Sequence, residues 1–373
     1  MSVEVDRDVR FMREALMLAR RGWGRTHPNP MVGAVIVENG QVVAEGWHAQ
    51  DGGPHAEKSA LAALGRKPQK GATLYVTLEP CSTPGRTGAC TDAILAAGIE
   101  TVVIGTLDPN PAHAGKALPL LESHGVAVRH GVLEPECRQL NRIFNHWIVN
   151  RKPYVAAKLA LTLDGKMATR SGHARWITGE ASRADVMRWR RLFPAIAVGA
   201  NTVLADDPQL TARLADDAVW CPLRCILDRS LRTVGDGALP KVYADAYAER
   251  TLVYCCEPVD SARLQRLRDA GVAVVTLAAD SDSAFLQAFV EDLAARNLTG
   301  VYFEPGPTLF KGLLEAAVLD YVWFYTAPKI VGDPDAPGLL VPQPPITMDQ
   351  ALSLMEPECQ VFGPDVCVSG RLR

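Results

Sequence analysis

The sequence contains no long apolar run and no strong charge imbalance. No hydrophobic stretch approaches the roughly 20 residues that a membrane-spanning helix needs, so we expect no membrane contact. A net charge of −3 gives no indication of a basic surface for nucleic acid. Repeats and low-complexity tracts are also missing. These absences favour a globular protein whose partners are small molecules.

Cysteine is not rare, but the nine cysteines show no regular framework. Their odd number suits a reducing compartment better than a disulfide-stapled secreted domain. The first residues, 1–13, are charged rather than signal-like. We therefore expect a cytoplasmic protein.

Length and pattern predict two α/β domains. A chain of 373 residues, 48% hydrophobic and 22% charged, is long enough for two cores. In the first half, a hairpin around Asn39-Gly40 precedes strand–helix units, which indicates a mixed sheet covered by helices. We expect strands at residues 33–37, 41–47, 74–79, 101–105 and 127–130, and helices at 7–20, 56–64, 91–97 and 116–123. Residues 146–153 are interpreted as the link, so the expected domains are 1–148 and 149–373.

The second half restarts with a strand at residues 154–163 and is expected to form a second α/β domain. The other strands are expected at residues 195–199, 223–227, 251–255, 272–276, 301–304 and 321–326, and the helices at 181–191, 261–269, 284–296 and 308–316. Residues 199–208 are interpreted as a long polar loop. The final segment, 359–372, is predicted to run extended and to close the sheet antiparallel.

The most informative motif combines His55, Glu57, Cys81 and Cys90. The histidine and the second cysteine each open a predicted helix, where backbone amides favour thiolates. An imidazole and two thiolates form a three-ligand zinc set that leaves the fourth position for water. Glu57, which the metal does not need, can carry protons between that water and a leaving amine. The motif predicts a hydrolytic deaminase with one zinc ion per chain.

Two other interpretations of this motif stay open. The same residues can form a structural zinc site, which closes with a fourth ligand, and His48 is the nearby candidate. They can also be unrelated core residues. The spacing differs from the Pro-Cys-x-x-Cys form of nucleobase deaminases, because eight residues separate Cys81 from Cys90.

Further segments are candidate binding elements. Asn29 lies in a proline-rich loop and is either part of a rigid turn or a pyrimidine contact. Arg86 lies between the two cysteines, as a solvated arginine or as a cation beside the metal pocket. Asp108 and Asn110 follow a strand end, the usual place for site residues in an open α/β sheet, although an Asp-Pro turn is the alternative.

In the second half, residues 304–309 join a strand to a helix whose amino terminus suits a dinucleotide phosphate. The GxGxxG fingerprint is missing, so a Rossmann domain is not supported. Arg213 lies just beyond the polar segment 199–208, which is otherwise a well-capped surface loop.

Together these segments resemble the RibD family of bifunctional riboflavin-biosynthesis proteins, in which a pyrimidine deaminase is fused to a reductase. The resemblance covers nearly the whole chain. It rests on HPNPMVG, HAE, TLEPCS with GRT before Cys90, DPNP, KLALTLDGKMA, RWIT, VGANTVLADDP and EPGPTL. It implies a cytidine-deaminase-like α/β/α domain followed by a dihydrofolate-reductase-like α/β domain.

The resemblance also implies the chemistry. The expected reactions are zinc-dependent deamination of 2,5-diamino-6-ribosylamino-4(3H)-pyrimidinone 5′-phosphate and then NADPH-dependent reduction to 5-amino-6-(5-phospho-D-ribitylamino)uracil. The family assembles through the reductase domain, so a homo-oligomer is expected.

Residue roles follow by the same resemblance. His55, Cys81 and Cys90 correspond to zinc ligands, and Glu57 to the proton shuttle. The positions implied for the deaminase substrate are Asn29, Arg86, Asp108 and Asn110. Those implied for NADPH are Ala160, Trp176, Thr202, Asp206, Arg229, Gly306, Pro307, Thr308, Leu309, Phe310, Lys311 and Gly312. Those implied for the ribosyl substrate are Ala174, Arg190, Leu210, Arg213 and Glu304.

The chain departs from the family pattern at several positions. Thr83 stands where histidine is common, and Gly88-Ala89 where the family has Pro-Pro. Ala174 replaces a common serine, which leaves only a backbone contact there. Arg229 stands where a serine often contacts the cofactor.

Two functions from other classes compete with this interpretation. A nucleic-acid deaminase uses the same zinc core, but the second α/β domain and the lack of a basic stripe argue against it. A zinc-stabilised scaffold that binds nucleotide without catalysis has no need of Glu57, which is present.

Overall fold

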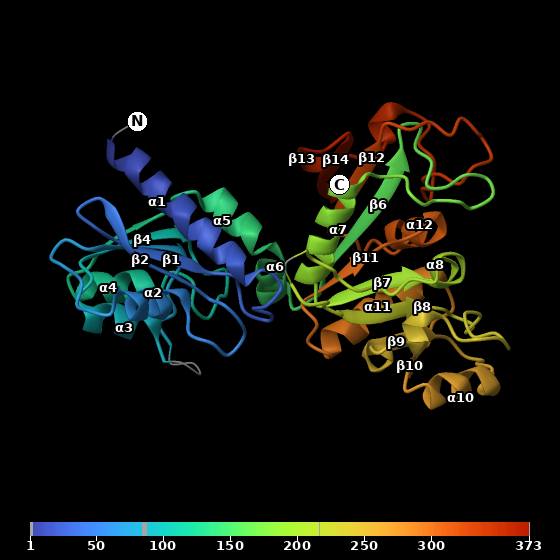
Figure 1. Ribbon diagram of the computed structural model, residues 1–373, viewed down its shortest axis with the longest axis horizontal. Coiled ribbons are helices and arrows are strands. Elements are labelled where there is room, and N and C mark those ends of the chain that lie inside the picture. The colour runs from blue at the N-terminus through green and yellow to red at the C-terminus, as the bar shows by residue number, and fades with distance from the viewer. Residues whose placement is uncertain (1–2, 84–87, 216, 373) are drawn as a thin grey trace. The chain divides into compact units, whose positions relative to one another are not determined.

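The computed structural model describes residues 3–83, 88–215 and 217–372 of the chain (Figure 1). The chain divides into two compact units, Met1–Arg151 and Lys152–Arg373. Each unit has its own sheet and its own hydrophobic core, so the prediction of two α/β units is confirmed.

The first unit is built on a five-stranded sheet in the order β2-β1-β3-β4-β5. β1 pairs antiparallel with β2 and β3, whereas β3, β4 and β5 run parallel, which confirms the mixed sheet. Its strands are β1 (Gly33–Glu38), β2 (Gln41–Trp47), β3 (Thr73–Leu78), β4 (Thr101–Thr106) and β5 (Ala127–His130). Its helices are α1 (Val3–Ala19), α2 (Ala56–Leu64), α3 (Cys90–Ala97), α4 (Ala117–Ser123), α5 (Glu134–Leu140) and α6 (Arg142–Asn150).

Helices cover both faces of this sheet. α2, α3 and α4 lie on one face, and α1 and α5 lie on the other (Figure 1). Every residue of β1 is buried, as expected for a strand covered on both sides. A Cβ atom at Gly46 of β2 would lie 2.3 Å from the backbone nitrogen of Ala60 in α2. This close approach fixes α2, which begins next to His55.

The second unit contains a nine-stranded sheet in the order β10-β9-β8-β7-β11-β6-β12-β14-β13. Its strands are β6 (Tyr154–Thr162), β7 (Ala195–Gly199), β8 (Leu223–Leu227), β9 (Thr251–Cys255), β10 (Ala273–Thr276), β11 (Gly300–Phe303), β12 (Tyr321–Ala327), β13 (Leu354–Phe362) and β14 (Asp365–Leu372). The strands from β10 to β12 run parallel, and the β13–β14 hairpin adds to β12 antiparallel, as predicted for the end of the chain. Its helices are α7 (Glu180–Leu192), α8 (Ala200–Asp206), α9 (Lys241–Ala244), α10 (Ser261–Asp269), α11 (Asp282–Ala295) and α12 (Pro307–Glu315).

The core of this unit has two chemically different layers. Aliphatic and aromatic residues of α11 and α12, including Phe289 and Leu313, pack with inward side chains of the strands. A second set consists of aromatic side chains and includes Trp189 of α7 and Trp323 of β12, whose ring centroids lie 4.4 Å apart. Phe193 packs on Tyr302 of β11 with ring centroids 5.3 Å apart.

Two sequence interpretations need correction. Residues 200–206 form α8 rather than a polar loop, because Val203 is buried against the sheet and tertiary packing outweighs weak helix propensity. Residues 146–150 belong to α6 rather than to a link, with Ile143 and Trp147 buried one helical turn apart. The helices α5 and α9 are absent from the predicted elements. No helix in the described part of the chain is long and apolar enough to cross a membrane.

Candidate active sites

The three predicted metal ligands converge at the starts of two helices. His55 precedes α2 as its N-cap, and Cys90 is the first residue of α3. His55 Nδ1 lies 3.5 Å from Cys81 Sγ and 3.3 Å from Cys90 Sγ. Zinc bonds of about 2.0 to 2.3 Å place tetrahedral ligand atoms about 3.5 Å apart, so this donor set fits zinc. Among the described residues, these three form the one group with ligand atoms close enough to hold a metal.

The second helix supports the cysteines with backbone hydrogen bonds. The amide of Cys90 donates to Cys81 Sγ at 3.3 Å and to Cys81 O at 3.0 Å. A hydrogen bond with Cys90 lowers the pKa of Cys81 to about 4, whereas hydrogen bonding to Cys81 and burial raise the pKa of Cys90. As zinc ligands both thiols would be deprotonated, because a metal-bound thiol loses its proton.

Glu57 lies beside the ligands without belonging to their set. Its side chain is buried, and burial raises its pKa above the ordinary value of 4.5. His48, the candidate for a fourth ligand, is also buried, but its Nδ1 lies 3.0 Å from the carbonyl of Pro54. It is not one of the clustered ligands in the described part of the chain. Three ligands are typical of a catalytic zinc site and four of a structural one.

The predicted pyrimidine contacts lie near this group. Asn29 donates to Asp51 at 3.0 Å and lies 3.4 Å from His48 Nε2, and the His48 and His55 rings are in edge contact with centroids 5.5 Å apart. Asp108 accepts from the amide of Asn110 at 2.9 Å, and burial raises the pKa of its carboxyl group. Arg86 lies outside the described residues.

In the second unit, Glu304 follows β11 and receives two cations. Arg190 of α7 contacts it at 2.5 and 3.0 Å, and Lys158 Nζ of β6 lies 3.2 Å away. Burial alone would raise the pKa of Glu304, but the charges of Arg190 and Lys158 lower it to about 2. Arg190 also donates to the carbonyl of Thr211, which connects this cluster to the segment with Leu210 and Arg213.

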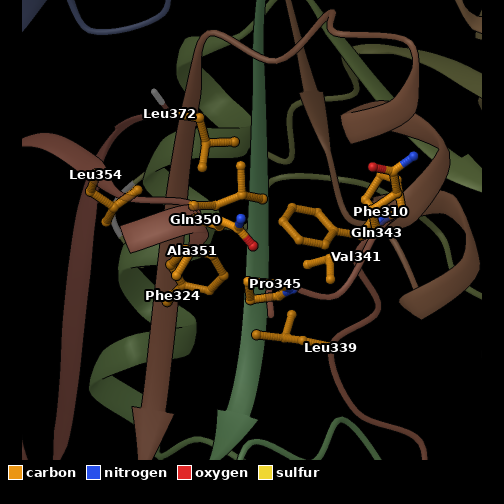
Figure 2. A pocket seen from close by; sticks show the side chains of 12 residues that line it. Phe310, Phe324, Leu339, Val341, Gln343, Pro345, Gln350, Ala351, Leu354 and Leu372 are labelled. Carbon is orange, nitrogen blue, oxygen red and sulfur yellow. The ribbon is translucent and has the colours of Figure 1, made fainter. Parts of the chain in front are cut away.

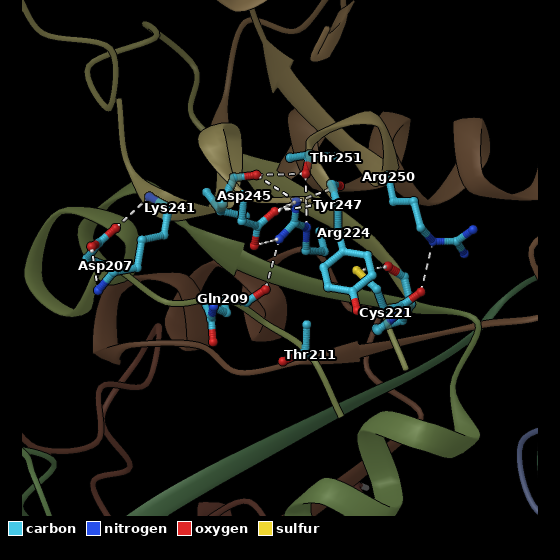
Figure 3. A network of polar contacts seen from close by, with 12 residues as sticks. Asp207, Gln209, Thr211, Cys221, Arg224, Lys241, Asp245, Tyr247, Arg250 and Thr251 are labelled. Atoms are coloured by element: carbon cyan, nitrogen blue, oxygen red, sulfur yellow. Dashed lines mark hydrogen bonds and ion pairs between the residues drawn. The ribbon is translucent and has the colours of Figure 1, made fainter. Parts of the chain in front are cut away.

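That segment, residues 209–213, is held by a buried arginine. Arg224 is completely buried and donates to the carbonyl of Gln209 at 3.0 Å and to both oxygens of Asp245 (Figure 3). Leu210 is buried with φ +57°, and Arg213 donates to Thr211 Oγ1 at 2.8 Å. The hydrogen bond from Arg190 to Thr211 therefore connects Glu304 to the segment that carries Leu210 and Arg213.

Other predicted positions form a second group. Arg175 donates to the carbonyl of Asp206 at the end of α8, so the segment with Ala174 and Trp176 lies next to that helix. The Trp176 ring is 62% exposed and lies under the Arg183 guanidinium, 4.7 Å from the ring centroid. Thr202 is half-buried in α8, and Ala160 is half-buried in β6.

The residues from Gly306 to Gly312 differ in how far they are buried. Gly306 is the N-cap of α12 and has no side-chain cap, and a Cβ added there would meet no atom within 4 Å. Pro307, Thr308 and Leu309 form the first turn. Phe310 and Gly312 are buried, and Lys311 pairs with Glu315. The Arg229 guanidinium forms an ion pair with Asp282 at 2.5 Å.

Sequence reasoning missed several residues that shape these sites. Lys158 belongs to the KLALTLDGKMA motif, and no role is assigned to it from the sequence. In the structure it contacts Glu304. Arg224 and Thr211 are not among the predicted site residues. A lysine and an arginine inside apolar strands are signals that can be found in the sequence, because a buried cation needs a carboxylate or several carbonyl partners.

Comparison with known proteins identifies the two units. The model of the RibD C-terminal domain matches residues 153–368, and that of the cytidine and deoxycytidylate deaminase zinc-binding region matches residues 5–106. The riboflavin biosynthesis protein RibD of Actinobacillus pleuropneumoniae is 40% identical over 359 residues, which cover 96% of this chain and 94% of that protein. The chain belongs to the RibD family.

Solved RibD structures agree over the full length. RibD from Acinetobacter baumannii matches with a TM-score of 0.83 and 34% identity, covering 99% of both chains. The diaminohydroxyphosphoribosylaminopyrimidine deaminase/5-amino-6-(5-phosphoribosylamino)uracil reductase of Thermotoga maritima matches with a TM-score of 0.82 and 35% identity, also covering 99% of both. The predicted arrangement is confirmed: a cytidine-deaminase-like unit precedes a RibD reductase unit, and the chain is a bifunctional enzyme of the riboflavin pathway.

Proposed function

We propose that the first unit deaminates 2,5-diamino-6-ribosylamino-4(3H)-pyrimidinone 5′-phosphate and that the second unit reduces the ribosyl group of the product with NADPH. The observation that carries the first half is a three-ligand metal group with a buried carboxylate beside it. His55, Cys81 and Cys90 would hold zinc and leave one position open. This arrangement suits hydrolysis better than a structural role.

Glu57 is the proposed proton carrier of the deaminase. Bound zinc would lower the pKa of a coordinated water to about 7 and supply the nucleophile. The buried Glu57, whose pKa is raised, can accept a proton and return it to the departing amino group. Asn29, Asp108 and Asn110 would hold the pyrimidine through hydrogen bonds, and Arg86 would contact the substrate from the segment between the cysteines.

NADPH is the proposed hydride donor of the second unit. Its phosphates would approach the first turn of α12, where Gly306 leaves open space in front of uncapped backbone amides. Thr202 and Asp206 of α8, Trp176, Ala160 and Arg229 are the remaining proposed contacts of the cofactor. Arg213 would bind the substrate phosphate, while Arg190 and Glu304 would line the ribosyl site with Leu210 and Ala174.

A stepwise assay tests this assignment. Zinc-loaded protein given the diamino pyrimidine phosphate without NADPH is expected to release ammonia and then stop. When NADPH is then added, the protein should oxidise one molecule of NADPH for each molecule of deaminated product. Absence of ammonia release from zinc-loaded, folded protein would contradict the proposal.

We also propose that two or more copies assemble through the reductase unit. β13 is an edge strand, and Val361 on it is 71% exposed. The segment before β13, residues 339–352, exposes Ile346 (91%) and Met348 (86%). The same segment lines an apolar pocket of about 460 Å³ next to Phe310 and Phe324 (Figure 2). An exposed edge strand flanked by apolar side chains can pair with its own copy about a two-fold axis.

Light scattering checks this assembly. The expected mass is a multiple of 40.3 kDa, and Val361→Glu should shift it toward one chain. A single-chain mass for the unaltered protein at all concentrations would exclude the assembly.

A further inference from the structure

The carboxylate of Glu79 holds the segment between β4 and α4 at three points. Glu79 follows β3 and is 5% exposed. Its Oε2 accepts from the amides of Asp108 at 3.0 Å and Gly115 at 2.9 Å, and its Oε1 accepts from the amide of Ala117 at 2.9 Å. Both ends of the segment are therefore tied to one side chain.

The held segment carries two of the proposed pyrimidine contacts. The backbone amide of Asp108 donates to Glu79. The carboxylate of Asp108 accepts from the amide of Asn110 at 2.9 Å. Asn110 Oδ1 in turn accepts from the amide of Ala112 at 3.0 Å. Glu79 thus holds the backbone of the segment, and these two local hydrogen bonds hold the polar side chains on it.

Glu79 also stands two residues before a zinc ligand. Only Pro80 separates it from Cys81, and proline restricts its own φ and the backbone of the residue before it, Glu79. The amide of Glu79 donates to the carbonyl of Thr106 at 2.9 Å, which fixes the end of β3 against the end of β4. One short stretch therefore positions a metal ligand and the recognition segment relative to each other.

We infer that Glu79 is a positioning residue of the deaminase, which sets the distance between the metal group and Asp108 and Asn110. It does not touch the substrate and acts through the backbone amides. This inference rests on the proposed deamination, since Asp108 and Asn110 have their role only there. A structural role alone would affect folding and leave substrate affinity unchanged.

Glu79→Gln provides the test, because glutamine keeps the shape but offers one acceptor oxygen in place of two. At least one of the three amides then faces an NH₂ group. We expect KM for the diamino pyrimidine phosphate to rise about tenfold while kcat changes little, since binding common to ground and transition states is lost. Zinc content and NADPH oxidation on pre-deaminated substrate should stay unchanged.

Glu38→Gln is the matched control. Glu38 is a buried carboxylate of the same sheet, and it accepts from Arg66 and from the amide of Gln69. The control should lower the melting temperature without changing KM. If Glu79→Gln behaves in the same way, the inference is wrong.

A double variant separates positioning from an independent effect. Asp108→Ala alone should raise KM, and adding Glu79→Gln should raise it no further, because both changes remove the same contact. Effects that multiply would overturn the inference. Should Glu79→Gln not fold, Glu79→Asp, which keeps the charge but withdraws it by one methylene, is subjected to the same assays. Failure of the proposed function is distinguishable, because then the unaltered protein releases no ammonia.

Discussion

Arg190 and Glu304, 114 residues apart in the sequence, form a two-point ion pair with side chains only 12% and 13% exposed. The pair lies at the carboxyl end of β11, next to the segment that carries Arg213. Lys158 adds a second cation to the same carboxylate. The proposed ribosyl site therefore contains a preformed charged cluster, and the ion pair with Glu304 holds the Arg190 side chain in place.

The first prediction concerns acid stability. The folded pKa of Glu304 is about 2, below its ordinary value of 4.5, so its ionised form stabilises the fold above pH 4.5 and this contribution is lost as pH falls toward 2. Between pH 6 and pH 3 the loss should be about 2 kcal/mol. Urea unfolding at both pH values measures it. Glu304→Gln should reduce the pH dependence by this amount, and an unchanged dependence would count against the ion pair.

A second prediction separates Glu57 from the ligands. Glu57→Gln should retain zinc and lose deamination by about 10²-fold or more, the usual contribution of a positioned acid–base group. Metal analysis and ammonia release on the same sample decide the matter. Loss of zinc in parallel with activity would show that Glu57 serves the metal or the fold.

The third prediction tests the phosphate role of Arg213. Arg213→Ala should raise KM for the ribosyl substrate about 10- to 100-fold, the worth of a charge-assisted hydrogen bond. The affinity for NADPH should remain unchanged. Arg296→Ala, which removes a partly exposed arginine paired with Asp292 in the same unit, is the control and should leave KM as it is. If both variants had the same KM, Arg213 would not bind the substrate phosphate.

The fourth prediction concerns the cofactor. Valine fits at Gly306 in the folded chain, because the backbone has φ −77° and an added Cβ meets no atom within 4 Å. Its side chain would occupy the space in front of α12, so Gly306→Val should weaken NADPH binding about tenfold without changing the melting temperature. Fluorescence titration with NADPH provides the measurement. An unaltered dissociation constant would place the cofactor phosphates elsewhere.

Much of the fold could be predicted because hydrophobic periodicity marks strands and helices locally. The expected strands follow from such patterns, and so does the extended final segment that closes the sheet antiparallel. α8 could not be predicted in this way, since Asn201, Thr202 and Asp206 are weak helix formers and packing of Val203 on the sheet decides its state. α6 had a usable signal in Ile143 and Trp147, one helical turn apart, but the following Arg151-Lys152-Pro153 suggested an earlier break.

The site residues also differ in how readily the sequence alone reveals them. Close spacing and distinctive chemistry make His55, Glu57, Cys81 and Cys90 a recognisable group in the amino-acid sequence alone. The partners of Glu79 and of Glu304 are long-range contacts, and a single sequence does not reveal that a carboxylate pairs with backbone amides or with an arginine on another element. These contacts depend on the tertiary fold.

The central claim is that one chain carries two chemically independent sites, and selective metal removal tests it most directly. A strong chelator should abolish ammonia release from the diamino pyrimidine phosphate, because the clustered metal ligands lie in the first unit. The same chelated sample should oxidise NADPH at the original rate when it receives pre-deaminated substrate. Restored zinc should recover ammonia release. Loss of NADPH oxidation on that substrate, in protein that remains folded, would contradict the account.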